Sequence, residues 1–259
     1  VRAVAWDGRW LYLGVGPRLY VAGRCGDPEP NVVGWSDPMP GIVHDIAVGG
    51  DRAWVALGAA GVAAVDVGNP ADPREGPATP LAGAVADVPG EALALALAGD
   101  RLWVAGTAGV HAFDVSRGIA RPTGHLIAPA GGFGGAALDI AVDDAGRAHV
   151  AWSMHGLRVL ELEGGDIREV GRDPRGDWFA EALDVANGIA WVAGQGGTLR
   201  AIDVAEPARP RERSAVPFTE PEEPMADLSV AAAGDRVFIA GADVEGGYSV
   251  VLQELTADA

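Results

Sequence analysis

Short apolar segments, separated by polar residues and glycines, follow one another along nearly the whole chain. In residues 44–73, three such segments (45–48, 52–56 and 62–67) are joined by glycine-containing connections. These connections are typical of β-hairpins, because glycine and aspartate accept positive φ angles at little cost. Segment 91–98 is rich in Ala and Leu, but its large residues alternate with a period of two, which predicts a strand rather than a helix. The pattern therefore predicts an all-β protein.

The same unit recurs along the chain. Asp-Ile-Ala-Val stands at 45–48 and again at 139–142, and Asp-Val-Ala at 184–186. We used the large residue of the second strand of each unit as a ruler; it falls at Leu11, Trp54, Trp103, His149, Trp191 and Phe238. The spacings are 43, 49, 46, 42 and 47 residues. Their mean, about 45 residues, is the period of a four-stranded propeller blade.

We therefore predict one domain, residues 1–259, that folds as a six-bladed β-propeller. The predicted blades are approximately 1–42, 43–90, 91–135, 136–180, 181–224 and 225–259. The first unit has four strand segments, and the last has three, ending at Tyr248–Leu255. The last blade is then either three-stranded or completed by residues that precede Val1. The start directly in a strand, without Met, favours a processed or trimmed N-terminus.

Residues 44–73 resemble the LVIVD repeat, with its apolar Asp-x-Ala-Val strand, its aromatic-Val-Ala strand, its Val-Asp-Val strand and its Asn-Pro turn. Residues 92–115 and 181–210 resemble it as well. The resemblance implies a propeller that is commonly secreted or exposed on the cell surface, and it implies little about chemistry. We expect an extracellular or cell-envelope location, and a cytoplasmic one stays open.

The formal net charge of −17 limits the classes of partner. All 19 basic residues are arginine, and the acidic balance argues against nucleic-acid binding, which needs clustered positive charge. We expect no nucleic-acid partner and, since no apolar run reaches transmembrane length, no membrane insertion. The lone cysteine, Cys25, excludes an internal disulfide and is interpreted as a free thiol, because no activating motif surrounds it.

Propellers usually bind ligands at the mouth of the central channel, where loops entering the first strand meet loops joining the second and third strands. Trp178 and Phe179 stand side by side in such a loop, followed by Glu181. Two aromatic rings beside a carboxylate suit a sugar, an aromatic ligand or a cation. The alternative is that both rings fill space between the fourth and fifth blades.

His155 stands in a second unusual loop, where other units have small residues. With His44, Glu91 and Glu181 it forms a candidate acid–base set at the same mouth. These residues come from separate blades and lack metal-ligand spacing, so we predict no metal site and no cofactor. The simplest alternative is that all of them are ordinary loop residues.

Aspartates recur at Asp45, Asp139, Asp184 and Asp227, with Arg2 and Ala94 at that position in the other units. A ring of carboxylates could bind Ca²⁺. Recurrence favours a structural role instead, in which each carboxylate accepts hydrogen bonds from backbone amides. We expect the same of Asp66, Asp114 and Asp203, which precede turns.

These observations favour a monomeric binding module with a small-molecule or protein ligand at the channel mouth. The alternatives are a small-molecule enzyme of the hydrolase, lyase or cyclase type that uses a His/Glu acid–base pair at the same mouth, and a structural cell-surface protein. No nucleophile elbow, phosphate loop or dinucleotide fingerprint occurs in the sequence.

Overall fold

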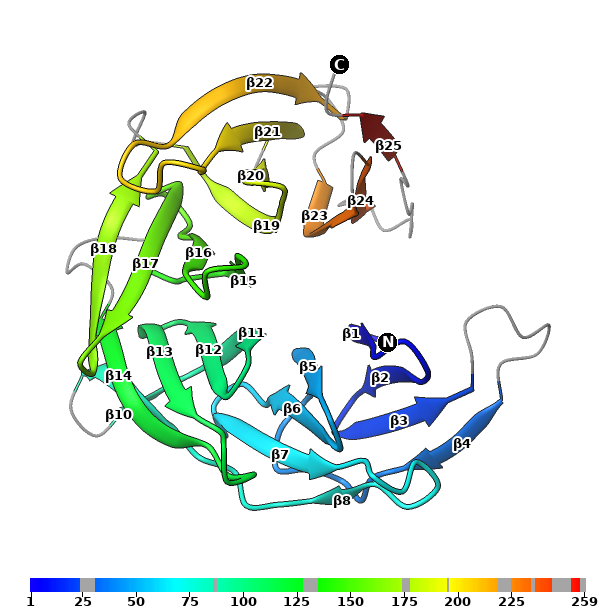
Figure 1. The fold of residues 1–259 in the computed structure, drawn as a ribbon. Helices are drawn as coiled ribbons and strands as arrows, with labels where there is room; N and C mark the ends of the chain where they lie inside the picture. The colour runs from blue at the N-terminus through cyan, green and yellow to red at the C-terminus, as the bar shows by residue number, and fades with distance from the viewer. Residues whose placement is uncertain are drawn as a thin grey trace. The chain divides into compact units, whose positions relative to one another are not determined.

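The structure is a computed structural model that describes residues 1–23, 31–85, 88–127, 135–173, 178–194, 196–218, 225–233, 236–243 and 253–256. Within these ranges, every helix or strand assigned is a β-strand. The chain divides into two compact units, Val1–Ala128 and Pro129–Ala259. Figure 1 labels the strands of both units.

Among its described residues, the unit Val1–Ala128 contains three four-stranded sheets and one short hairpin. The first sheet is β1 (Ala3–Trp6), β2 (Leu11–Val15), β3 (Arg18–Ala22) and β4 (Val32–Trp35). The second is β5 (Asp45–Gly49), β6 (Arg52–Ala56), β7 (Val62–Asp66) and β8 (Arg74–Glu75). The hairpin is β9 (Leu81–Val85) with β10 (Val88–Gly90), and the third sheet is β11 (Ala92–Ala98), β12 (Arg101–Gly106), β13 (Gly109–Asp114) and β14 (Arg121–Ile127).

The unit Pro129–Ala259 contains two four-stranded sheets and, among its described residues, one sheet of three strands. The first of these sheets is β15 (Asp139–Val142), β16 (Ala148–Ala151), β17 (Leu157–Glu163) and β18 (Asp166–Arg172). The second is β19 (Ala180–Ala186), β20 (Ile189–Gly194), β21 (Thr198–Asp203) and β22 (Arg211–Pro217). The three-stranded sheet is β23 (Met225–Ala233), β24 (Arg236–Asp243) and β25 (Gln253–Thr256).

Within each of these larger sheets, antiparallel strands are adjacent in chain order, which is the topology of a propeller blade. The strand predicted over 91–98 is confirmed as β11. The repeat predicts that Val88–Glu91 is a loop entering the first strand of the third unit. This prediction is wrong in part, because Val88–Gly90 forms strand β10 and pairs with β9. Glycine and proline in this segment hid its strand character from the hydrophobic pattern.

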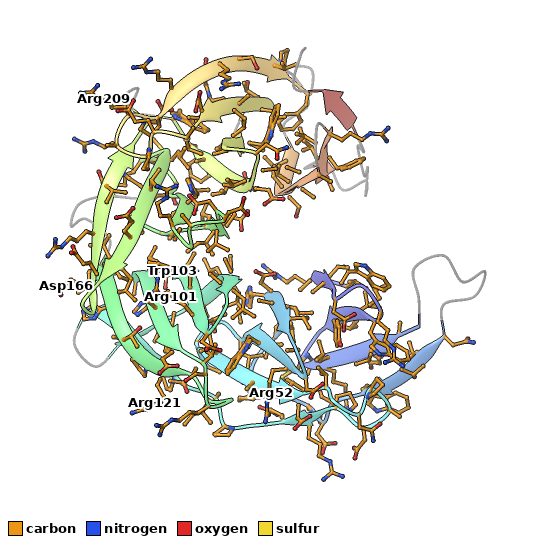
Figure 2. The ribbon with its side chains drawn as sticks, in the orientation of Figure 1. Arg52, Arg101, Trp103, Arg121, Asp166 and Arg209 are labelled. Carbon is orange, nitrogen blue, oxygen red and sulfur yellow. The ribbon has the colours of Figure 1, made fainter. Side chains whose placement is uncertain are left out.

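Four of the six ruler residues lie in the core: Trp54, Trp103 (labelled in Figure 2), His149 and Trp191 are 2%, 0%, 0% and 6% exposed. Phe238 is only half-buried, whereas its neighbours Val237 and Ile239 are 0% and 1% exposed. In the first sheet, the buried position belongs to Tyr12, which is 1% exposed, rather than to the predicted Leu11. The hydrogen bonds from Arg2 N to Gly14 O and from His44 N to Ala56 O fix the equivalence, because Tyr12 and Trp54 each lie two residues before the acceptor. A shift of one residue moves a side chain to the opposite face of a strand.

Three aspartates, one in the unit Val1–Ala128 and two in the unit Pro129–Ala259, connect the first strands of neighbouring sheets. Asp45 accepts the N–H of Ile46 at 2.8 Å through Oδ1 and that of Leu95, on the next sheet, at 2.7 Å through Oδ2. Asp139 does the same for Ile140 and Leu183, both at 2.8 Å. Their predicted structural role is thereby confirmed.

Asp184 repeats this arrangement from a different register. It accepts the N–H groups of Val185 at 2.7 Å and Ala232 at 2.8 Å. Asp184 lies opposite Trp191, whereas Asp45 lies opposite Ala56, two residues beyond the ruler residue of its sheet. The side chain of Asp227 falls outside the described residues.

The aspartates that precede turns also have the predicted role. Asp66, Asp114 and Asp203 each accept a backbone N–H from the residue two positions on, at 3.1, 2.9 and 3.0 Å. Aspartate side chains in turns commonly accept such hydrogen bonds from nearby backbone amides.

Candidate functional site

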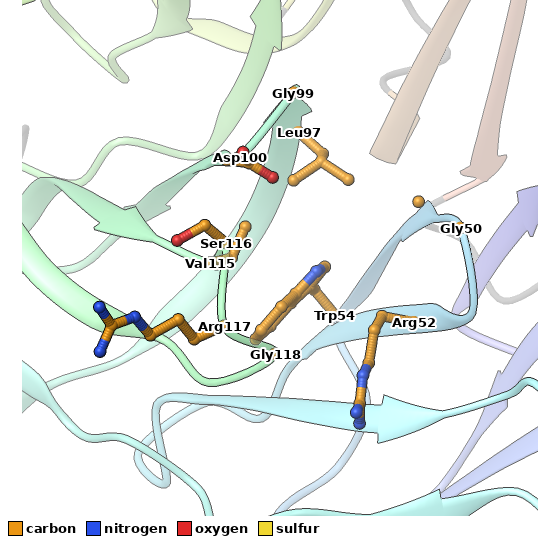
Figure 3. A pocket seen from close by; sticks show the side chains of 11 residues that line it. Gly50, Arg52, Trp54, Leu97, Gly99, Asp100, Val115, Ser116, Arg117 and Gly118 are labelled. Atoms are coloured by element: carbon orange, nitrogen blue, oxygen red, sulfur yellow. The ribbon is translucent and has the colours of Figure 1, made fainter.

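An open groove lies between the second and third sheets of the unit Val1–Ala128, and Figure 3 shows it from close by. Its volume is about 660 Å³. We call it the Arg52 groove; its lining comes from the β5–β6 turn, the β11–β12 turn, the segment after β13 and Trp54: Gly49, Gly50, Arg52, Trp54, Leu97, Gly99, Asp100, Val115, Ser116, Arg117 and Gly118. The turns that line it are at the ends of the strands opposite to the predicted channel mouth.

The sequence of the two hairpin turns explains why the groove between the two sheets is open. Both hairpin turns contain Gly-Asp-Arg, and Gly50 and Gly99 adopt φ angles of 57° and 58°. This left-handed conformation is easy for glycine and strained for most other residues. The turns therefore carry little side-chain bulk at the groove, so the space between the two sheets stays open.

The Arg52 side chain is positioned at the groove by contacts with Asp66 and Gly118. Its Nη1 lies 3.6 Å from the Asp66 carboxylate, and the two side chains are 41% and 50% exposed. The guanidinium also packs against Gly118, where an added Cβ would lie 3.2 Å from Nε. Gly118 therefore leaves the room that Arg52 occupies.

The rest of the lining combines an apolar base with polar groups. Trp54 is almost fully buried, and Leu97 is half-buried. Ser116 and Arg117 are exposed on the opposite wall. The hydrogen bond from Ser116 is the largest cause of the lowered pKa of the neighbouring Asp114 carboxyl, which is therefore a stable anion at neutral pH.

The candidate residues predicted at the mouth lie in both units. His44 and Glu91 belong to Val1–Ala128, and the other four belong to Pro129–Ala259. His44 is half-buried beside Gly58, and burial, followed by the charge of Arg2, lowers its pKa, while Glu91 acts in the opposite direction. Glu91 is exposed, and its backbone N–H donates to the Thr107 hydroxyl at 2.9 Å. His44 is thus kept neutral near a carboxylate.

Trp178 has several packing partners in its unit. Its indole N–H donates to Asp173 Oδ2 at 2.8 Å, and the Arg200 guanidinium lies 4.8 Å from its ring centroid. A Cβ added at Gly156 or Gly194 would come within 2.9 Å of the indole, so the ring fits closely between loops of two sheets. These contacts agree with the space-filling alternative. Phe179 follows it and is half-buried.

His155 and Glu181 have different surroundings. His155 is half-buried in a tight turn, where its backbone N–H donates to Trp152 O at 2.8 Å. Glu181 lies at an irregularity of the β19 ladder, and its Oε1 accepts the N–H of Leu228 at 3.2 Å. Glu181 thus links its sheet to the next one, much as Asp184 does.

From the repeat we predict a core position for His149, a partly exposed one for His111 and an exposed one for His125. His149 is a buried core residue, and its Nε2 lies 3.1 Å from Asp143 Oδ2. His125 is exposed. The prediction for His111 is wrong, because this residue, which pairs with His125 of the neighbouring strand, is only 3% exposed. Cys25 lies outside the described residues.

The Arg52 groove was missed because its wall residues come from turns about 50 positions apart in the sequence. The repeated Gly-Asp-Arg sequence marked both turns but did not show that they meet. Among the described residues, no group of three or more His, Cys, Asp or Glu is placed to hold a metal ion. The described part of the chain also lacks any helix with the length and apolar character needed to cross a membrane.

Comparison with known proteins supports the fold. Residues 40–76 match the sequence profile of the LVIVD repeat, which confirms the predicted resemblance. No curated protein sequence matches the chain.

Several solved structures are similar over nearly the whole chain. The periplasmic gluconolactonase PpgL of Pseudomonas aeruginosa has a TM-score of 0.72 at 14% identity, covering 98% of this chain and 87% of that one. The β-propeller domain of Cps50 (Swd1) from Myceliophteria thermophila has a TM-score of 0.70 at 12% identity, covering 94% and 80%. The computationally designed Ika8 protein has a TM-score of 0.68 at 11% identity, covering 98% and 70%. At these identities the likeness shows the fold alone: the chain is a β-propeller protein, and its six blades stay a prediction.

Proposed function

From the propeller fold, the LVIVD repeat and the Arg52 groove, we propose that this protein is a binding module for a small molecule that carries a carboxylate or a similar acidic group. The observation that supports the proposal is an open groove of about 660 Å³ whose lining includes Arg52 together with the apolar side chains of Trp54 and Leu97. Small-molecule sites typically have volumes of roughly 300–1,000 Å³ and combine apolar walls with a few polar groups.

Arg52 is suited to bind the acidic group of such a ligand. Its ion pair with Asp66 is single, 3.6 Å long and about half exposed. Exposed ion pairs of this kind contribute only about 0–1 kcal/mol, so exchanging Asp66 for a ligand costs little. A guanidinium can also bind a carboxylate through two parallel hydrogen bonds, which adds orientation to attraction.

The other lining residues define the rest of the ligand. Arg117 supplies a second, exposed cation, and Asp100 and Ser116 supply groups that can bind hydroxyls. Leu97 and Trp54 offer an apolar surface for carbon atoms. A hydroxylated organic acid, such as a sugar acid, has this combination of groups.

The test is calorimetric titration with sugar acids and short dicarboxylates, each paired with its neutral counterpart. We expect an acid to bind and its neutral counterpart to bind at least tenfold more weakly. Arg52→Gln should weaken acid binding at least tenfold. Arg74→Gln, which removes an exposed arginine paired with Asp72 on the same sheet, is the matched control and should change nothing. Acid binding that survives Arg52→Gln would place the site elsewhere.

The loop that carries Trp178 and Phe179 is a second proposed binding surface, for a small molecule or a protein. A ligand bound there should lose affinity in Trp178→Ala and keep it in Arg52→Gln. The enzyme alternative needs a histidine and a carboxylate within hydrogen-bond reach in a pocket. Among the described residues, the histidine–carboxylate hydrogen bond joins His149 to Asp143, and His149 is fully buried, so no observation favours catalysis.

A further inference from the structure

The Arg52 groove contains a carboxylate that the fold does not require. Asp100 lines the groove from the β11–β12 turn of the third sheet, and it is exposed. Its backbone carbonyl accepts the N–H of Val115 at 2.9 Å. In the sheet β19–β22, Gly188 accepts the N–H of Val204 in the same way, at 2.8 Å. The backbone alone therefore serves the fold at this position. Among the described residues, the Asp100 side chain forms no hydrogen bond or ion pair.

Arg52, on the second sheet, also has unused bonding capacity. Its contact with Asp66 is 3.6 Å long, whereas Arg74 binds Asp72 at 2.6 Å. A guanidinium has five N–H donors, and among the described residues none of those of Arg52 forms a hydrogen bond. The equivalent position on β20 is occupied by Ile189, opposite the aspartate that corresponds to Asp66. The fold of a sheet therefore does not require an arginine at this position.

A continuous series of contacts connects the two charged residues. Val115, which is bonded to Asp100, accepts the N–H of Gly118 through its carbonyl at 2.9 Å. Gly118 lies against the guanidinium, because an added Cβ would be 3.2 Å from Arg52 Nε. Figure 3 shows Asp100 on the third sheet and Arg52 on the second, both among the residues that line the groove. One small ligand can therefore meet a cation and an anion in the same groove.

The charges at the groove do not favour a ligand that is purely anionic. The lining supplies two cations, Arg52 and Arg117, and the carboxylate of Asp100. Asp66 lies beside Arg52, and Asp114 lies within electrostatic reach of Arg117. Two arginines and three aspartates together leave one negative charge in excess. A positive group on the ligand, placed at Asp100, would turn the repulsion by this carboxylate into attraction.

We propose that the acid bound in the Arg52 groove also carries a protonated amine, so that its carboxylate contacts Arg52 and its ammonium contacts Asp100. This inference rests on the proposed acid-binding function and narrows the ligand to zwitterions such as amino acids and short peptides. A hydrogen bond between ions is roughly twice as strong as a neutral one, so Asp100 favours an ammonium over a hydroxyl. Trp54 and Leu97 line the space for the carbon skeleton, and Ser116 is left for hydroxyl groups.

The test is calorimetric titration with sets of ligands that differ in one charge. Each set contains a parent zwitterion, its N-acetyl derivative, which keeps only the acid, and its amide, which keeps only the amine. The parents are alanine, β-alanine, 4-aminobutyrate and dialanine, which place the amine at different distances from the acid. We expect at least one parent to bind at least tenfold more tightly than either of its derivatives.

Asp100→Asn removes the charge and keeps both the size of the side chain and the backbone contact. It should weaken binding of the parent at least tenfold, and it should not weaken binding of the N-acetyl derivative, because a repulsive carboxylate is gone. Arg52→Gln should weaken both. Asp144→Asn, which changes an exposed aspartate in the corresponding β15–β16 turn, is the matched control and should change neither.

The results distinguish failure of this inference from failure of the acid-binding function. An N-acetyl derivative that binds through Arg52 as tightly as its parent would overturn the inference and leave acid binding intact. Binding of the parent that survives Asp100→Asn would overturn it as well, as would binding of sugar acids but of none of these parents. Both proposals are overturned if no acid binds.

Discussion

Single aspartate carboxylates join neighbouring sheets within each unit by accepting hydrogen bonds from backbone amides. Asp45 satisfies one amide of its own strand and one of the next sheet, at 2.8 and 2.7 Å. Backbone ladders hold each sheet together, and a backbone bridge between Gly58 and Ala92 joins these two sheets at one end. No ladder joins β5 to β11 themselves, so the Asp45 side chain adds a polar contact along these strands. Asp139 and Asp184 repeat the arrangement in the other unit.

Asp45→Ala should therefore be costly although it removes only a small side chain. It leaves the Leu95 N–H without its acceptor, and we expect a loss of about 1–3 kcal/mol in the free energy of unfolding. Asp45→Asn keeps an acceptor oxygen and should lose less. Urea denaturation measures both, with the exposed Asp72→Ala as a control expected to stay within about 0.5 kcal/mol of wild type. Equal stability of Asp45→Ala and Asp72→Ala would contradict this role.

At the scale of strands and turns, an outer strand of one sheet touches the turn after the third strand of the next sheet. An added Cβ at Gly34 in β4 would lie 2.2 Å from Pro70 O, and one at Gly171 in β18 would lie 1.8 Å from Pro207 O. Both glycines lie at an irregularity in their strand ladder. Pro70 belongs to the Asn-Pro turn of the repeat, so this turn has a packing partner in the preceding sheet.

Gly171→Ala should separate these elements, because the clash is with rigid backbone rather than with a mobile side chain. Overpacking of this kind costs about 1–3 kcal/mol, which chemical denaturation can measure. Gly76→Ala is the matched control, since its added Cβ would meet only Ala64 O, at 3.3 Å. A Gly171→Ala protein as stable as Gly76→Ala would show that the contact relaxes freely.

Across the whole molecule, buried ionisable groups respond to acid in opposite directions. The pKa of His111 is lowered to about 4 by burial, so the unfolded chain takes up this proton first and acid destabilises the fold. Burial raises the pKa of Asp139 to about 6, so the folded state takes up that proton first and acid stabilises it. Acid should therefore destabilise Val1–Ala128 through His111 and relieve a cost in Pro129–Ala259 through Asp139.

The contribution of His111 can be isolated by comparing wild type with His111→Gln across pH. The stability due to neutral His111 is fully present above about pH 6.5 and is lost as pH falls toward 4, by about 3 kcal/mol in all. The difference in unfolding free energy between the two proteins should change by this amount, measured by urea denaturation. His155→Gln, at a loop position of the other unit, is the control. A pH-independent difference for His111→Gln would contradict the shift.

The sequence allowed the strands and the repeating carboxylates to be predicted, because both follow from local periodicity. Asp45 and Asp66 belong to a pattern that recurs with the blade, and their amide contacts follow from it. The burial of His111 could not be predicted, because the period-two pattern of its strand does not show how deeply a polar side chain is buried. The Arg52 groove exists because turns of the second and third sheets lie close together. The periodicity within one strand carries no information about the distance between turns of different sheets.

The aspartate contacts also make it possible to distinguish the separation of two neighbouring sheets from the unfolding of a single sheet. The amide hydrogens of Leu95 and Leu183 are held by side chains of a neighbouring sheet, whereas the amides of the strand ladders are held within their own sheet. Solvent exchange at these two amides therefore reports the parting of adjacent sheets even while every hairpin stays closed. Should they exchange earlier than the ladder amides, the propeller would loosen between blades before any blade unravels.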